Sequence, residues 1–147
     1  MKYKQRIIPE VNIPKEWDCI SSNELRNIML DIARSYKGTS VKNKHIGINV
    51  SFTVANSKKV SKGGAVYKKK AALLFVLPKL IENAEYSNWG TRKPTDPSDV
   101  VGFLNFKAKC KIDGKIDNCR IAIQFRVGGK FFYNIEVNKK PSTKRTI

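Results

Sequence analysis

Two alternating segments joined by Asp113-Gly114 constrain the fold of this chain more than any other feature. Apolar residues occupy every second position over 104–112 and again over 119–127. This period is typical of strands with one buried face, and Asp-Gly between such segments is the strongest short signal for a tight β-hairpin. A two-residue turn predicts three cross-strand pairs on one face: Leu104 with Ile123, Phe106 with Ile121, and Ala108 with Cys119.

A third alternating segment over 131–137 continues this hairpin into a meander. Gly128-Gly129-Lys130 predicts a three-residue loop in which Val127 faces Phe131 and a glycine takes the left-handed conformation. We therefore expect three antiparallel strands with one apolar and one polar face.

The polar face of the predicted meander gathers cationic, amide and aromatic side chains. Its members are Phe103, Asn105, Lys107, Lys109, Arg120, Gln124, Arg126, Phe132, Asn134 and Glu136. A merely solvated sheet face would show the same periodicity, so the pattern leaves open whether this face binds a ligand.

Helices are predicted in the sequence both before and after residues 45–54. Ser21, three residues before Glu24, predicts a capping box, and the helix that it starts is expected to end at Gly38. A second helix is expected from about Ala65, and Pro78 is expected to start a short third one that ends near Glu85. Residues 89–98 read as a linker loop, and residues 1–18 as an extended segment with a possible edge strand.

Residues 45–54 alternate again and predict a fourth strand. Its polar side would continue the polar face of the meander and would bring His45, the only histidine, to that surface. A histidine at the start of a strand can equally be only exposed, so both interpretations of His45 stay open.

Basic residues gather in two parts of the chain, and they favour a polyanionic partner. The formal net charge is +17, residues 41–80 carry nine basic residues and no acidic one, and residues 101–147 carry eleven basic and three acidic ones. Such a field favours nucleic acid, ahead of an anionic membrane surface or an acidic protein. The glycine-ended loop over 56–64 could bind phosphate, and Lys68-Lys69-Lys70 opposes the helix dipole and is expected to serve a partner.

The length predicts a single domain, 1–147, with a core over 19–138 and a basic tail over 139–147. The sequence contains no apolar run long enough for a membrane span and no signal peptide pattern. Cys110 and Cys119 would lie diagonally across the hairpin and are expected to be core thiols, not a disulfide. The expected fold is α+β, with the N-terminal helices packed on one face of a twisted antiparallel sheet of four or five strands.

Few titratable groups are available for catalysis, and the sequence shows no metal or cofactor motif. Cleavage of RNA without a metal fits this limit, because the 2′-hydroxyl of the substrate is the nucleophile. We expect Glu136 and His45 as base and acid, and Lys59, Arg120 and Arg126 as an electrostatic clamp. The expected RNA contacts are Lys58, Lys62, Lys68, Lys69, Lys107, Lys109, Gln124 and Asn134.

Several segments resemble the phage and polymorphic-toxin branch of the barnase, EndoU, colicin and RelE superfamily, in particular the domain associated with large polyvalent phage proteins. The resemblance covers about residues 20–138. It rests on residues 42–54, 58–64 and 106–114, on Leu77-Pro78-Lys79-Leu80-Ile81-Glu82-Asn83-Ala84-Glu85-Tyr86, and on Gly129-Lys130-Phe131-Phe132-Tyr133. This chain has Val60 where the superfamily often has a histidine, and Asn134-Ile135 where it often has an acidic residue followed by a histidine.

The resemblance implies a small ribonuclease, often one that cleaves transfer RNA. It further implies the C-terminal part of a secreted effector, as in contact-dependent growth inhibition, that acts in the cytoplasm of a target cell and is neutralised by an acidic immunity protein. We expect a monomer or a one-to-one complex with that protein. Two alternatives remain: a non-catalytic nucleic-acid-binding module, and an interaction domain for an acidic protein.

Overall fold

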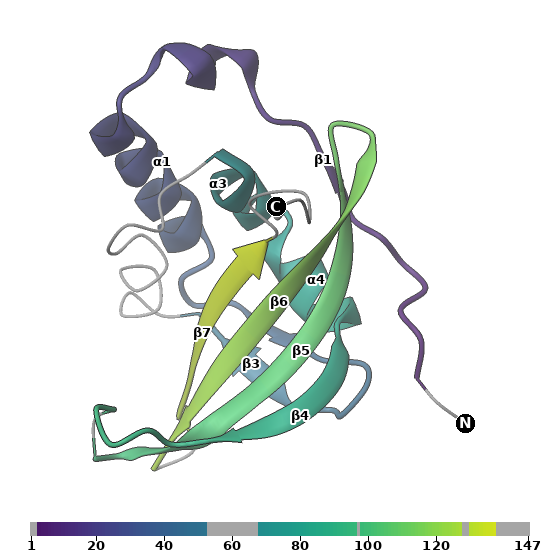
Figure 1. Ribbon diagram of the computed structural model, residues 1–147, viewed down its shortest axis with the longest axis vertical. Helices are drawn as coiled ribbons and strands as arrows, with labels where there is room; N and C mark the ends of the chain where they lie inside the picture. Colours follow the sequence, from purple (N-terminus) through teal and green to yellow (C-terminus); the bar gives the residue numbers. More distant parts are fainter. Residues whose placement is uncertain (1–2, 53–67, 97, 128–129, 138–147) are drawn as a thin grey trace, which may run out of the picture.

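The protein folds as two layers, with helices against one face of a five-stranded sheet (Figure 1). The computed structural model describes residues 3–52, 68–96, 98–127 and 130–137, the last range by its backbone alone. The helices are α1 (Ser22–Ser35), α3 (Lys68–Leu74) and α4 (Leu77–Asn83), preceded by the short 3-10 helix η1 (Lys15–Cys19). The sheet contains β1 (Glu10–Val11), β4 (Glu85–Thr91), β5 (Val100–Ile112), β6 (Lys115–Arg126) and β7 (Lys130–Val137).

This architecture confirms the predicted α+β class. The strands follow the order β1-β5-β6-β7, and β4 pairs with β5 beside β1. The sheet is mixed and not purely antiparallel, because β1 runs parallel to β5, with Glu10 beside Lys111. No helix in the described part of the chain is long and apolar enough to cross a membrane.

The β5–β6 hairpin has the predicted register. Leu104 pairs with Ile123, Phe106 with Ile121 and Ala108 with Cys119. Asp113 and Gly114 both have positive φ angles, 50° and 82°. A turn with two left-handed residues matches the twist of antiparallel strands, which explains why this dipeptide sets the register correctly.

The β6–β7 register differs from the predicted one by two residues. Phe125 lies opposite Phe131 and Arg126 opposite Lys130, whereas we expected Val127 to face Phe131. The loop between the paired residues is therefore 127–129 and not 128–130. Because both loops contain three residues, every residue of β7 keeps the face that was predicted for it.

The apolar face of the sheet packs on the helices, as predicted. Ser21 and Glu24 form the predicted capping box of α1, and Gly38 follows the helix with a φ of 83°. Pro78 lies in the first turn of α4. The buried core includes Leu25, Met29 and Ala33 of α1, Leu73 of α3, Leu77, Leu80 and Ile81 of α4, and Phe106, Ala108, Cys119, Ile121 and Ile123 of the sheet.

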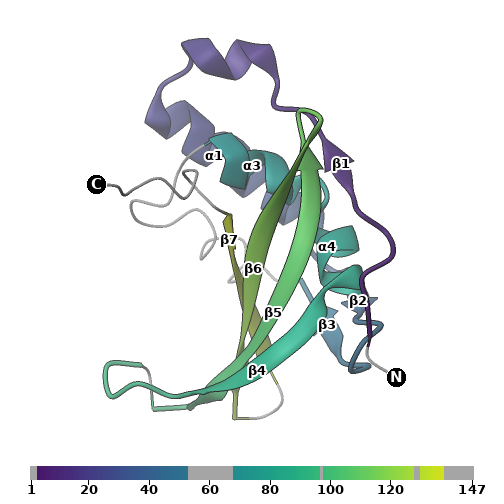
Figure 2. The same ribbon diagram turned by 45° about the vertical axis from the view of Figure 1, so that its right-hand side comes forward.

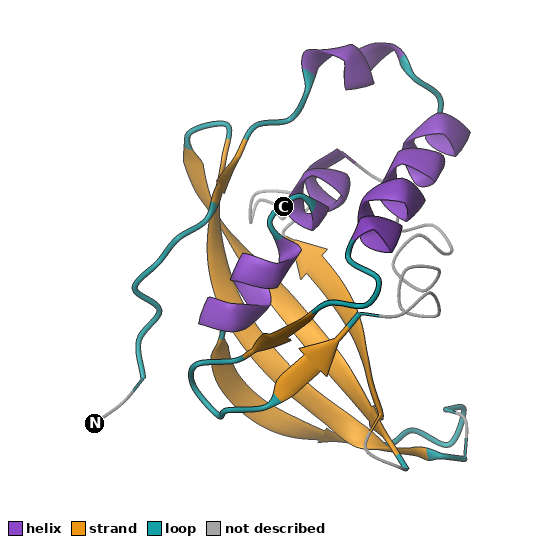
Figure 3. Cartoon of the chain, turned by 180° about the vertical axis from the view of Figure 1, so that it is seen from behind, coloured by secondary structure: helices purple, strands orange, loops and turns teal. Residues whose placement is uncertain are grey.

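Two predictions about strands are wrong. Part of the expected linker loop over 89–98 belongs to β4, which pairs with β5 from Glu85 to Thr91 with an irregularity between Tyr86 and Asn88. The expected strand over 45–54 does not join the main sheet. Its central residues form β3 (Asn49–Ser51), which pairs only with β2 (Ser40–Lys42), and this small sheet lies on the helical side (Figure 3). Residues 53–54 lie outside the described part.

The outer edge of β5 is covered along most of its length. β4 pairs with β5 up to Lys107, and β1 pairs with it from Lys111 onward. Between them the Gln5 side chain replaces a strand, because its amide donates to the Lys109 carbonyl at 3.0 Å and accepts from the Lys109 N–H at 2.8 Å. Figure 2 shows β1 beside the turn end of the hairpin. Such cover prevents pairing with other chains.

The three cysteines are expected to differ sharply in reactivity. Cys19 is exposed, whereas burial raises the pKa of Cys110 to about 11 and that of Cys119 to about 12. Only Cys19 should therefore react with a thiol reagent in the native state, and all three after denaturation. Rapid native reaction of two or three thiols would contradict this assignment.

The raised pKa values of Cys110 and Cys119 also make the stability depend on pH. Unfolded thiols lose their protons near pH 9, so the free energy of unfolding should fall as the pH rises above that value.

Candidate functional site

The sheet face opposite the helices is open among the described residues. Figures 1 and 3 show the helices and the β2–β3 sheet on the other side. The open face is formed by alternate residues of β4, β5 and β6, as the register requires. The residues that define it here are Glu85, Phe103, Asn105, Lys107, Lys109, Asn118, Arg120 and Ala122.

One row of charged residues crosses four strands of this face. Glu85 of β4 lies beside Lys107 of β5, Lys107 beside Arg120 of β6, and Arg120 beside Glu136 of β7. Like charges directly opposite each other, with Cβ atoms about 5 Å apart, destabilise a sheet. Lys107 and Arg120 are such a pair, and each has a glutamate position as its other neighbour in the row.

Two adjacent hollows lie on the face and share Arg120. The first, of about 530 Å³, is lined by Lys4, Gln5, Ile8, Glu85, Lys107, Ala108, Lys109, Asn118, Cys119 and Arg120. The second, of about 340 Å³, is lined by Gly90, Thr91, Lys93, Phe103, Asn105, Phe106, Arg120, Ile121 and Ala122. Basic residues outnumber acidic ones in both. Arg120 thus occupies the position from which one side chain reaches either hollow.

Among the side chains that the structure describes, which do not include those of β7, Lys107, Lys109 and Arg120 form no ion pair. The five ion pairs found there do not include Lys107, Lys109 or Arg120. All three are exposed, and Glu85 is partly buried beside them. Exposed cations beside one another, without a carboxylate within ion-pair distance among the described side chains, are suited to hold phosphate groups.

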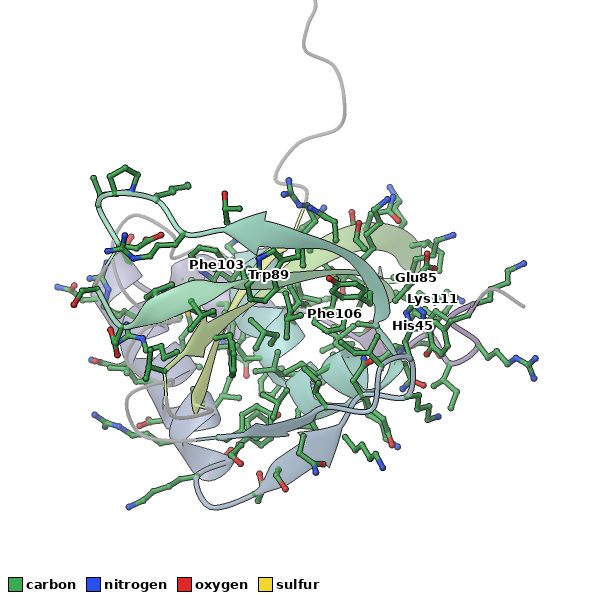
Figure 4. All side chains as sticks on the ribbon, turned by 90° about the horizontal axis from the view of Figure 1, so that it is seen from below. His45, Glu85, Trp89, Phe103, Phe106 and Lys111 are labelled. Carbon is green, nitrogen blue, oxygen red and sulfur yellow. The ribbon has the colours of Figure 1, made fainter. Side chains whose placement is uncertain are left out.

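His45 lies at the outer edge of β4 and not on the open face. Its Nδ1 accepts the backbone N–H of Tyr86 at 2.8 Å, and its ring stacks on Tyr3 with centroids 4.6 Å apart. Figure 4 shows His45 at the same end of the sheet as Glu85, away from Trp89 and Phe103. The turn over 44–46 places it there, because β3 starts only at Asn49. The predicted continuity of its strand with the meander is wrong.

Tyr3 fastens the N-terminal segment beside this edge. Its hydroxyl donates to the Asn83 carbonyl at 2.8 Å. Burial, and then the negative charges of Glu85 and Glu82, raise the pKa of Tyr3, so the hydroxyl keeps its proton and its role as donor. The segment is thereby fixed next to the carboxylate that lines the first hollow.

Arg126 and Gln124 lie at the far end of β6 and interact with each other. Arg126 Nε donates to Gln124 Oε1 at 2.8 Å, and Arg126 Nη1 lies 3.3 Å from Asp99 Oδ2. Arg126 lies six positions after Arg120 along β6, which corresponds to about 20 Å. The two arginines therefore cannot hold the same phosphate, and Gln124 is buried.

The lysines of α3 point to acidic residues of the protein itself. Lys68 pairs with Asp18, and Lys69 Nζ lies 3.3 Å from Asp117 Oδ2. Both lie in the helical layer, so the structure does not bring these two predicted RNA contacts to the open face. Lys68 and Lys69 thus have acidic partners within the protein itself, and their positions give no support to the predicted role of Lys68–Lys70 toward an external partner. Lys58, Lys59 and Lys62 lie outside the described residues.

Sequence reasoning missed two charged residues that line the first hollow, Lys4 and Glu85. Glu85 was expected at the end of a helix, and Lys4 in a segment without assigned contacts. The backbone of Asn134 lies beside Ala122 and that of Glu136 beside Arg120, which shifts both by two residues from the predicted register but keeps them on the predicted face. The described residues contain no group of three or more His, Cys, Asp or Glu side chains that could hold a metal ion.

The fold and this face define a small α+β domain with an exposed cationic sheet surface. The chain matches the model of the family described as large polyvalent protein-associated domain 3 over residues 21–133, and it belongs to that family. This confirms the predicted link to large polyvalent proteins. No curated protein and no solved structure matches the chain significantly.

Proposed function

We propose that this domain binds single-stranded RNA on the open face and cleaves it as a metal-independent endoribonuclease. The observation that supports this most is the row in which Lys107 and Arg120 lie side by side between two glutamates. Phe103, which lines the second hollow, offers a ring for base stacking. An association with large polyvalent proteins is compatible with an effector domain that is delivered to another cell.

The row offers the groups that 2′-hydroxyl attack requires. A carboxylate of Glu85 or Glu136 takes the 2′-hydroxyl proton, and the 2′-oxygen then bonds to phosphorus. Lys107 and Arg120 stabilise the charge on the phosphorane. The bond from phosphorus to the 5′-oxygen breaks, and that oxygen takes a proton from the Lys107 ammonium or from water. The products are a 2′,3′-cyclic phosphate and a 5′-hydroxyl end.

A non-catalytic RNA-binding module is the second candidate, and the position of His45 favours it. The histidine Nδ1 already accepts a backbone N–H, and its ring lies outside the open face. If His45 is not the acid, catalysis depends on the lysine or on water. We propose in either case that the RNA on this face is transfer RNA, that the domain acts in the cytoplasm of a target cell, and that an acidic immunity protein covers the cationic face.

Incubation of the purified protein with total RNA in EDTA tests this function. We expect fragments with cyclic phosphate ends, and no cleavage of a DNA strand of the same sequence, which lacks the nucleophile. Glu85→Gln and Glu136→Gln each replace a carboxylate by an amide and keep the size of the side chain. The variant that lacks the true base should cleave RNA more slowly by about a hundredfold or more.

His45→Ala is the matched comparison in this assay. Full activity of His45→Ala would exclude histidine as the acid and agree with its position at the β4 edge. RNA that stays intact but migrates more slowly in a native gel when the protein is present would favour the non-catalytic binding module. RNA that is neither cut nor bound would contradict both candidates.

A further inference from the structure

The N-terminal segment Tyr3–Pro9, here called the strap, forms one wall of the first hollow. Lys4, Gln5 and Ile8 line it on one side, and Lys107, Lys109 and Arg120 line it on the other. The family match begins only at residue 21. The first hollow is therefore enclosed by a segment that the family model does not include.

The strap is held at three points, and Lys4 lies between two of them. Tyr3 bonds to the Asn83 carbonyl and stacks on His45. Gln5 makes two hydrogen bonds to the backbone of Lys109, and the Pro9 carbonyl accepts from Lys111 N at 2.8 Å. An exposed lysine between two anchored neighbours has a fixed backbone, and so loses less entropy when it binds an anion.

Neighbouring cations of the strap lie in different surroundings. Lys4 lines the first hollow, together with Glu85 and Lys107. Arg6 lines a separate hollow with Tyr3, Ile7, Lys44 and Asn83, which Lys4 also reaches. The chain thus offers two exposed cations, two residues apart, of which one lines the row of charged residues and one does not.

We propose that the strap and the β5–β6 hairpin enclose a nucleotide subsite, in which Lys4 binds a backbone phosphate of RNA together with Lys107 and Lys109. The proposal rests on the function proposed above and extends the binding surface beyond the sheet. The sugar or base of that nucleotide packs against Ile8, which is 39% exposed and lines the same hollow. Gln5 is a positioning residue, because it contacts the Lys109 backbone and holds Lys4 over the hollow.

The test measures binding of a fluorescein-labelled 2′-O-methyl hexauridylate, which cannot be cleaved, by anisotropy. Lys4→Glu should weaken binding by about tenfold relative to Arg6→Glu, which makes a charge change of the same sign and size two residues away. The difference between the two variants isolates the local interaction from the long-range field. Equal losses of affinity for Lys4→Glu and Arg6→Glu would overturn the subsite.

A second comparison tests the role of Gln5. Gln5→Ala should weaken binding about threefold, and the same change in a Lys4→Ala background should have no further effect. Additive effects would mean that Gln5 acts without Lys4 and would overturn its positioning role. Arg120→Glu is measured in parallel: if it weakens binding by about thirtyfold or more while Lys4→Glu behaves as Arg6→Glu, the subsite fails and the proposed function stands. If the wild type does not bind, the proposed function fails.

Discussion

Arg120→Glu is expected to weaken RNA binding by about thirtyfold to a hundredfold, which corresponds to about 2–2.7 kcal/mol. Arg120 is exposed, lines both hollows and lies beside Lys107. The substitution reverses the charge of this side chain. It removes the charge-assisted hydrogen bond that we propose from Arg120 to an RNA phosphate, and it places a carboxylate next to that phosphate. The slope of log affinity against log salt concentration should also become shallower by about 0.7 for each phosphate that the variant no longer binds. Anisotropy titrations at several salt concentrations measure both quantities.

Lys115→Glu is the matched control for this prediction. Lys115 is exposed, its substitution changes the net charge by the same amount, and it lies at the turn end of the β5–β6 hairpin, opposite Ile112. It lines neither hollow. The affinity of this variant should stay within about threefold of the wild type, because only the screened long-range field changes. Equal effects at the two positions would show that net charge alone drives binding.

Asn43→Ala is expected to lower the free energy of unfolding by about 3–5 kcal/mol. Asn43 is fully buried, and its side-chain amide donates to the carbonyls of Ile81, at 2.7 Å, and Ala84, at 3.0 Å. Its Oδ1 accepts the N–H groups of His45 and Ile46, each at 3.0 Å. Alanine leaves two carbonyls and two N–H groups without their partner. Urea unfolding should show a lower midpoint with an unchanged slope.

Two further variants sharpen this prediction. Asn43→Asp keeps the acceptor for the two N–H groups but turns an oxygen toward the two carbonyls, so it should also destabilise the protein strongly. Asn12→Ala removes an amide from an exposed position after β1, and the free energy of unfolding should change by less than about 0.5 kcal/mol. A small effect of Asn43→Ala would mean that water or a rearranged turn replaces the side chain.

Local signals explain which parts of the fold could be predicted from the sequence. The α1 capping box and the Asp113-Gly114 turn involve residues close in the chain, and both formed as expected. The alternation then carried the register outward and placed Lys107 beside Arg120. The sequence did not determine which residue begins the β6–β7 loop, because a register shift by two residues keeps every side chain on the same face.

Long-range contacts explain what could not be predicted. β4 has little alternation and is mostly half-buried or exposed, and it is a strand because the edge of β5 is available to it. The segment over 45–54 alternates, yet Gly47 with a φ of 75° lies in the connection that leads to β3, and β3 pairs with β2. Glu85, Lys4 and His45 owe their positions to these contacts, so the sequence pattern could not assign them.

The central claim is that the open face, and not the helical layer or the His45 edge, holds RNA. Amide NMR spectra of isotope-labelled protein, recorded during titration with the 2′-O-methyl hexauridylate, test it most directly. We predict that shifts concentrate at residues 103–109 and 118–122, with Lys4 and Gln5, and that amides of α1 and of residues 44–46 stay unchanged. Shifts centred on α1, α3 or the turn around His45, with residues 103–109 and 118–122 unaffected, would contradict the claim.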